Sequence, residues 1–202
     1  TEVAATHRAR FADRFTAARM GADTAQLYDD ILTARKRTDH MVTRIGFIGA
    51  GGIAHRHFGV LETMEDVRIA AICDPDLSRA EEAGKRFGAA VFADHAAMLD
   101  QVELDAVFIC IPPFAHGAHE RSCIAKRLPF FVEKPLSLDL KLAEEISAEA
   151  EGLVTAVGYH WRYLDTVDEA RAQLANNPAH LMTGFWLDQT PPPQWWWRED
   201  GS

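Results

Sequence analysis

The sequence has few basic residues, few cysteines and no long apolar run, and each shortage excludes a class of protein. Its 202 residues include 21 lysines and arginines against 30 aspartates and glutamates, a net charge of −9. A nucleic-acid-binding surface needs a basic patch, and a membrane-spanning helix needs about 20 apolar residues. The chain has neither feature and opens without a signal-peptide pattern. We therefore expect neither a nucleic-acid nor a membrane partner.

The scarce cysteines exclude a disulfide scaffold and a thiolate metal site. Cys73, Cys110 and Cys123 are odd in number and have neither disulfide nor zinc spacing. Their apolar or helical surroundings are typical of reduced, buried thiols in a cytoplasmic protein. Hydrophobic residues make up 48% of the chain and charged residues 25%, the balance of an ordinary globular protein of one or two domains.

Residues 1–40 differ from the rest of the chain because they contain helical apolar spacing and no strand-like run. They are either a helical extension packed on the main domain or the tail of an upstream domain. The segment RFTAARMGADTAQLYDDIL resembles the C-terminal helices of nucleotide-sugar glycosyltransferases. Since the chain starts at Thr1 and stops on a loop-like run, we interpret both ends as cut.

Between residues 41 and 157, short apolar runs alternate with amphipathic segments. Such runs predict strands, and the segments between them predict helices. Apolar strands joined by helices indicate a parallel sheet covered on both faces, and right-handed crossovers make a Rossmann-type doubly wound α/β fold the expected outcome. The predicted strands span residues 44–48, 67–73, 90–92, 104–111, 129–132 and 153–157.

The pattern changes after Val157. A helix is expected at 164–174, and residues 180–188 alternate as in a strand with two different faces. We interpret residues 158–202 as the incomplete start of a second α/β domain with a largely antiparallel sheet.

The segment GAGGIA, residues 49–54, fits the G-x-G-x-x-A pattern that follows the first strand of a dinucleotide-binding fold. Gly49 permits the tight turn, and Gly51 lets the backbone approach a pyrophosphate. Gly52 and Ile53 open the following helix, whose N-terminal N–H groups favour phosphate. These four residues are therefore candidate cofactor contacts.

Asp74 ends the second predicted strand. A carboxylate there accepts hydrogen bonds from the adenosine ribose hydroxyls and favours NAD over NADP, although nearby Arg79 keeps NADP open. The alternative role for Asp74 is a helix cap, which Asp76 could fill instead.

Two further strand ends carry candidate residues. Ile111 and Pro112 follow the fourth strand at the expected nicotinamide side, while His116 either contacts the cofactor or caps and packs the next helix. Lys134 follows the fifth strand in FFVEKPLSL, where Pro135 restricts it toward extended conformations. A desolvated lysine has a lowered pKa and donates to a reacting oxygen, whereas the alternative is a solvated helix flank.

These motifs occur in an order that resembles the Gfo/Idh/MocA oxidoreductases. The match spans residues 43 to about 198 and comprises RIGFIGAGGIAHRHF, Asp74, CIPPFAH, FFVEKPLS and GYHWRY, of which EKP is the most specific. The resemblance implies an N-terminal Rossmann domain and a C-terminal α/β domain that carries substrate contacts and an oligomer interface.

The resemblance also implies roles for particular residues. Lys134 would lie beside the nicotinamide and the substrate carbinol, and Glu133 would position the lysine and the cofactor. Tyr159, His160 and Arg162 would line the domain junction near the substrate. Many members have Asn in place of Pro113, and the Asp and His pair of the second domain would lie beyond Ser202.

The expected activity is hydride transfer between NAD(P) and a hydroxyl or ketone of a sugar, nucleotide sugar or cyclitol, in a cytoplasmic homo-oligomer. Trp195, Trp196 and Trp197 could stack on the sugar and Arg198 could bind a polar group, unless the three tryptophans form a subunit interface. Alternatives are a glycosidase that retains NAD and a regulatory module without turnover, against which Lys134 argues. The 202-residue chain alone is expected to be inactive.

Overall fold

The computed structural model describes residues 42–175, 177, 180–181 and 183–185. Its centre is a six-stranded, all-parallel sheet of order β3-β2-β1-β4-β5-β6. The strand order reverses between β1 and β4, and ligands of open α/β sheets bind beyond the carboxyl ends of the strands at such a point. The strands are β1 (Thr43–Ile48), β2 (Val67–Cys73), β3 (Ala90–Phe92), β4 (Ala106–Ile109), β5 (Phe130–Val132) and β6 (Thr155–Val157).

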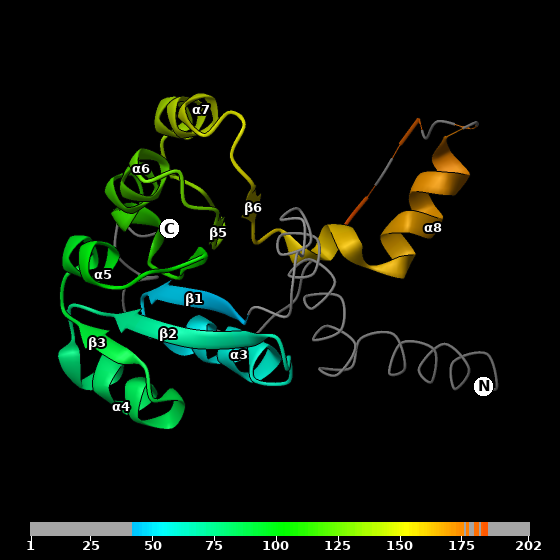
Figure 1. Ribbon diagram of the computed structural model, residues 1–202. Coiled ribbons are helices and arrows are strands. Elements are labelled where there is room, and N and C mark those ends of the chain that lie inside the picture. The colour runs from blue at the N-terminus through cyan, green and yellow to red at the C-terminus, as the bar shows by residue number, and fades with distance from the viewer. Residues whose placement is uncertain (1–41, 176, 178–179, 182, 186–202) are drawn as a thin grey trace.

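Helices cover both faces of this sheet (Figure 1). One face is covered by α3 (Gly52–Leu61) and α4 (Leu77–Phe87), and the other by α5 (His95–Gln101), α6 (Ala118–Ala125) and α7 (Leu140–Glu149). The short 3-10 helix η1 (Pro113–Ala115) follows β4. After β6 the chain passes through η2 (His160–Tyr163) into α8 (Asp165–Leu174), which extends away from the sheet in Figure 1.

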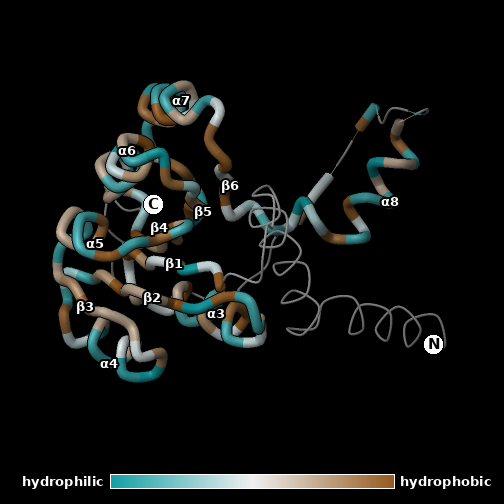
Figure 2. Tube along the Cα trace, viewed as in Figure 1, coloured by the Kyte–Doolittle hydropathy of each residue, from teal (hydrophilic) through white to brown (hydrophobic). Residues whose placement is uncertain are grey.

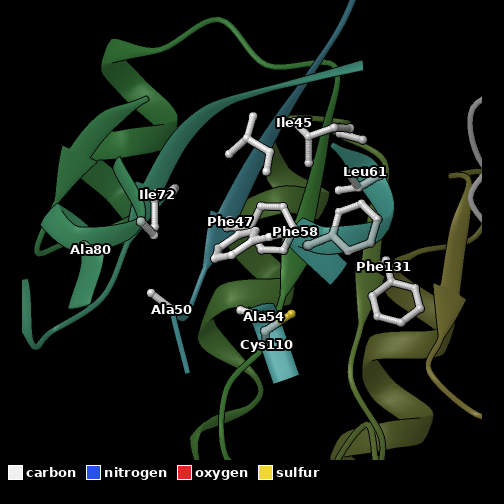
Figure 3. Packing of buried hydrophobic residues seen from close by; sticks show 14 residues of the cluster. Ile45, Phe47, Ala50, Ala54, Phe58, Leu61, Ile72, Ala80, Cys110 and Phe131 are labelled. Carbon is white, nitrogen blue, oxygen red and sulfur yellow. The ribbon is translucent and has the colours of Figure 1, made fainter. Parts of the chain in front are cut away.

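The core consists of one apolar layer on each face of the sheet. Successive strand residues alternate between the two layers, as a pleated strand requires. Phe47, Phe108 and Phe131 stack with ring centroids 5.0 Å apart on the α3 side, and Phe58 from α3 packs on Phe47 (Figure 3). Hydrophobic residues concentrate along the strands in Figure 2, whereas the helices also carry hydrophilic residues. The doubly wound α/β fold expected from the sequence is therefore confirmed.

The structure corrects several element boundaries. The strand expected at 104–111 spans only 106–109, because Leu104 packs on Gly46 before it and the chain leaves the sheet after Ile109. The strand expected at 153–157 begins at residue 155. Leu181 and residues 183–185 have no regular structure, so the described part of the predicted 180–188 strand is not a strand.

Several predictions fall outside the described residues. These include the helical or upstream-domain interpretation of residues 1–40, most of the incomplete second domain, and the candidates Trp197 and Arg198. In the part of the chain that is described, no helix is long and apolar enough to cross a bilayer.

Candidate cofactor and catalytic site

The glycine turn after β1 is fixed by contacts to the strands on either side. The Gly49 N–H donates to the Cys73 carbonyl at 2.7 Å, and the Cys110 N–H donates to the Ile48 carbonyl at 2.7 Å. Gly49 has a φ of +94°, and a Cβ built there would lie 2.2 Å from the Cys110 carbonyl oxygen. Only glycine fits this position, because the backbone conformation and the close approach both exclude a side chain.

The next two glycines face open space. No described atom outside their immediate neighbourhood lies within 4 Å of a Cβ built on Gly51 or Gly52. Gly51 caps α3 without a side-chain hydrogen bond, and the first turn of α3 contains no acidic residue. The N-terminal N–H groups and the positive end of the helix dipole therefore stay available to an anion. Ile53 lies beside them and is partly exposed.

Asp74 connects the end of β2 to the glycine turn. Its carboxylate is buried, with Oδ2 accepting the Ala50 N–H at 2.8 Å and Oδ1 accepting the Asp76 N–H at 2.9 Å. Asp76 caps α4 by accepting the Ser78 N–H, so the helix-cap alternative for Asp74 is wrong. Arg79 pairs with the Asp76 carboxylate at 3.2 Å. A buried carboxylate therefore stands beside the glycine turn, at the end of β2.

A buried acid–histidine pair follows β4. His116 Nδ1 lies 2.7 Å from Glu120 Oε1, and the Gly117 N–H donates to Glu120 Oε2. Burial raises the pKa of the Glu120 carboxyl, but the hydrogen bonds from His116 and Gly117 outweigh it and hold that pKa below its usual value. His116 Nε2 is buried and has no hydrogen-bond partner among the described residues. Such an atom calls for a ligand or water.

A second buried acid–histidine pair follows β5, and sequence reasoning missed its histidine. His57 Nε2 in α3 lies 2.8 Å from Glu133 Oε1, and both side chains are buried. The signal was available, since Ala54, His57, Phe58 and Leu61 share one helical face and the other three are apolar. A histidine in a buried stripe needs a polar partner.

Lys134 leaves β5 on the solvent side, next to Glu133. The sequence left open whether Lys134 is shielded from water or solvated, and the described structure leaves it exposed. The Lys134–Pro135 peptide bond is cis. The Glu133 N–H donates to the Ile109 carbonyl at 2.9 Å, so the strand ends that carry Lys134 and Ile111 lie side by side. Ile111 and Pro112 are half-buried there.

The junction residues lie after β6, the strand next to β5. Tyr159 is 53% exposed, Arg162 is exposed and stacks on the Tyr163 ring at 5.6 Å, and His160 is half-buried. The Gly158 N–H donates to the Val132 carbonyl at 2.9 Å, which places this segment beside the end of β5. Exposed polar and aromatic groups therefore follow the strand that pairs with β5.

The carboxyl edge of the sheet fits a dinucleotide. This edge carries an open glycine turn, the N-terminus of α3, a buried carboxylate at β2 and a buried histidine nitrogen that has no partner among the described residues. Among the described residues, no three histidine, cysteine or acidic side chains are grouped to hold a metal ion.

Known proteins are similar to this chain in sequence. Residues 43–159 match the model of the Gfo/Idh/MocA oxidoreductase family, an NAD-binding Rossmann fold. The chain is 30% identical to glucose-6-phosphate 3-dehydrogenase of Bacillus subtilis, covering 66% of this chain and 38% of that protein. It is 35% identical to inositol 2-dehydrogenase of Acidothermus cellulolyticus, covering 71% of this chain and 45% of that protein.

A solved structure is similar as well. The WlbA dehydrogenase from Chromobacterium violaceum, in complex with NADH and UDP-GlcNAcA, is 26% identical with a TM-score of 0.65 over 69% of this chain and 41% of that one. The chain thus spans less than half the length of these three proteins. The segment that resembles glycosyltransferase tails lies outside the matched range. The chain belongs to the Gfo/Idh/MocA oxidoreductase family, and residues 43–159 are its NAD-binding Rossmann fold.

Proposed function

We propose that the protein transfers a hydride between NAD and a CH–OH carbon of a sugar, nucleotide sugar or cyclitol. The observation that carries this proposal is the placement of Lys134. It follows β5 at the sheet edge where the glycine turn, Asp74 and the β4 end also lie. A cationic donor at the nicotinamide side of that edge suits a reaction in which an alcohol oxygen gains or loses a proton.

The cofactor contacts divide among the strand ends. Gly49 shapes the turn, while Gly51, Gly52 and Ile53 place the α3 N-terminus toward the pyrophosphate. Asp74 accepts from the ribose hydroxyls, which favours NAD over NADP because a carboxylate repels a 2′-phosphate. Bound NAD supplies the hydride acceptor.

The nicotinamide side is formed by the ends of β4 and β5. Ile111 and Pro112 flank the ring, and the His116 Nε2 atom donates to or accepts from the cofactor. Glu133 holds the turn that carries Lys134. These roles explain why buried polar groups with defined partners gather at this edge.

The substrate lies on the outer side of the lysine. Lys134 hydrogen-bonds the carbinol oxygen and stabilises it as its proton passes to a general base, the role that the family resemblance gives to a histidine of the second domain. Tyr159, His160 and Arg162 supply further polar contacts from the β6 side. Trp197 and Arg198, which lie outside the described residues, are proposed substrate contacts on the strength of the sequence alone. The relatives named above act on, or bind, a sugar phosphate, an inositol and a nucleotide sugar, which supports this substrate class.

The whole protein is proposed to be a cytoplasmic homo-oligomer. The test of its activity uses the full-length protein, NAD and a panel of myo-inositol, glucose 6-phosphate and a UDP-sugar, followed by nicotinamide absorbance. Reduction of NAD with at least one compound is expected. NAD binding without any absorbance change would contradict the proposal, and hydrolysis of a glycoside without net NAD consumption would replace it with the retained-cofactor alternative.

A further inference from the structure

His57 connects the cofactor helix to the lysine-bearing strand end. It lies in the middle of α3, the helix whose N-terminus faces the glycine turn, and it reaches across 76 positions of sequence to Glu133. The Nε2–Oε1 distance is 2.8 Å, and the two side chains are 6% and 9% exposed. A short hydrogen bond in a dry site fixes both partners more firmly than the same bond in water.

The second oxygen of Glu133 is also held by the protein. Oε2 accepts the Lys134 backbone N–H at 3.1 Å. A Cβ built on Gly158 would lie 3.1 Å from the same oxygen, so the chain leaving β6 closes over the carboxylate. Glu133 therefore spans three elements: α3 through one oxygen, the Lys134 turn through the other, and the β6 end through close packing.

Aromatic rings fix the orientation of His57. Its ring contacts Phe131 edge-on at a centroid distance of 5.0 Å and Phe108 at 5.6 Å. Figure 3 shows Phe131 beside the α3 residues in the same layer of the core. Because these rings hold the imidazole plane, the Nε2 atom has one direction available, and Glu133 occupies it.

We propose that His57 is a positioning residue that couples cofactor binding at the α3 N-terminus to the orientation of Lys134. An anion bound at that N-terminus restrains α3, the His57–Glu133 hydrogen bond carries the restraint to the end of β5, and Oε2 passes it to the Lys134 backbone. This inference rests on the proposed function only for the role of Lys134. The contacts of His57 and Glu133 do not depend on that role.

The test measures whether NAD shields Lys134 and whether that shielding needs His57. Each lysine of the 202-residue chain is acylated with a slow amine reagent, with and without NAD, and labelling is quantified by mass spectrometry. Lys85 in α4 is the internal reference. The His57→Gln variant keeps an N–H near the Nε2 position, whereas His57→Asn is too short to reach Glu133. His55→Asn, an exposed neighbour in the same helix, is the matched control.

In the wild-type chain and in His55→Asn, NAD is expected to slow the labelling of Lys134 and to leave Lys85 unchanged. His57→Gln should retain this protection, measured as the ratio of the Lys134 labelling rates without and with NAD. In His57→Asn this ratio should fall at least about fivefold, which is the lower end of a typical coupling. If His57 had only a structural role, the two replacements would change thermal stability, but the protection of Lys134 by NAD would not differ between them.

Two results would overturn the inference, and they differ in what else they overturn. Equal protection in His57→Asn and His57→Gln contradicts the coupling and leaves the proposed function standing. Binding of NAD to the wild-type chain without any protection of Lys134 contradicts the coupling together with the proposed place of Lys134 beside the cofactor.

Discussion

Asp74 Oδ2 accepts the Ala50 backbone N–H at 2.8 Å, and this bond joins the end of β2 to the glycine turn of β1. Ala50 is 2% exposed, so in the folded chain its N–H depends on this carboxylate for a hydrogen bond. The same carboxylate serves as the proposed ribose acceptor. One side chain therefore holds the turn in shape and, in the proposed function, also presents negative charge to the cofactor.

Replacing Asp74 with alanine is expected to reduce both stability and NAD affinity. The orphaned Ala50 N–H costs about 1–3 kcal/mol of unfolding free energy, and the ribose loses its acceptor. Asp76→Ala is the control, because it removes the α4 cap and the exposed pair with Arg79 but keeps Asp74, and the lost cap costs about 1 kcal/mol. Chemical denaturation and calorimetric NAD titration separate the two effects. Unchanged NAD affinity in Asp74→Ala would contradict the ribose role.

Replacing Gly49 or Gly51 of the turn with alanine is expected to have two different effects. Gly49→Ala combines a φ of +94° with a Cβ clash on the Cys110 carbonyl, so the unfolding free energy should fall by at least about 2 kcal/mol. Gly51→Ala meets open space and should fold like the wild type while binding NAD more weakly. Denaturation midpoints and NAD titrations of the two variants make the comparison. Tight NAD binding by Gly51→Ala would show that no phosphate approaches this residue.

The sequence was sufficient to predict the architecture, because the patterns that indicate strands, helices and the glycine turn are local. Each apolar strand and the glycine turn occupy consecutive residues, and strands that alternate with helices indicate a parallel, doubly wound sheet. The strand ends were harder to predict, because Cys110 and Ile111 are as apolar as the strand before them. Only the hydrogen-bond ladder of the sheet marks Ile109 as the last residue of β4.

The positions of the site residues could be predicted from the sequence, but their hydrogen-bond partners could not. Asp74, His116 and Lys134 each follow a strand, so their place at the carboxyl edge could be inferred. The bonds from Asp74 to Ala50 and from Glu133 to His57 join residues 24 and 76 positions apart, and no local pattern encodes such pairings. The exposure of Lys134 likewise depends on what packs beyond β5, which its neighbours in sequence do not determine.

Glu120 is expected to make stability depend on acid pH. Its pKa in the folded state lies below the usual value of 4.5, so the carboxylate contributes stability that is fully present above the unfolded pKa. This contribution is lost as the pH falls through the folded pKa. Glu120→Gln should therefore be destabilised at neutral pH, with the difference from wild type shrinking below about pH 4.5.

Denaturation at a series of pH values checks this, with Glu144→Gln on the exposed side of α7 as the control. A constant difference between Glu120→Gln and wild type across the acid range would contradict the linkage.

The three thiols are expected to resist modification in the native chain. Burial raises the pKa of Cys73 to about 11, with nearby Asp94 adding to it, and burial raises that of Cys123 to about 12. Burial also raises the pKa of Cys110, and its side chain is 5% exposed. Thiolate is the reactive form, so a maleimide at about pH 8 should label these residues only through unfolding. Rapid native labelling of Cys110 would contradict the closed packing at the end of β4.

The most direct test of the proposed mechanism replaces Lys134 with methionine in the full-length protein, with Lys141→Met on exposed α7 as the matched control. The measurement pairs turnover of an accepted sugar or cyclitol with calorimetric NAD affinity. We predict that Lys134→Met loses about 100-fold or more of kcat and keeps the NAD affinity of the wild type, while Lys141→Met changes neither. Turnover by Lys134→Met within a few-fold of wild type would contradict the central claim that Lys134 contacts the reacting oxygen.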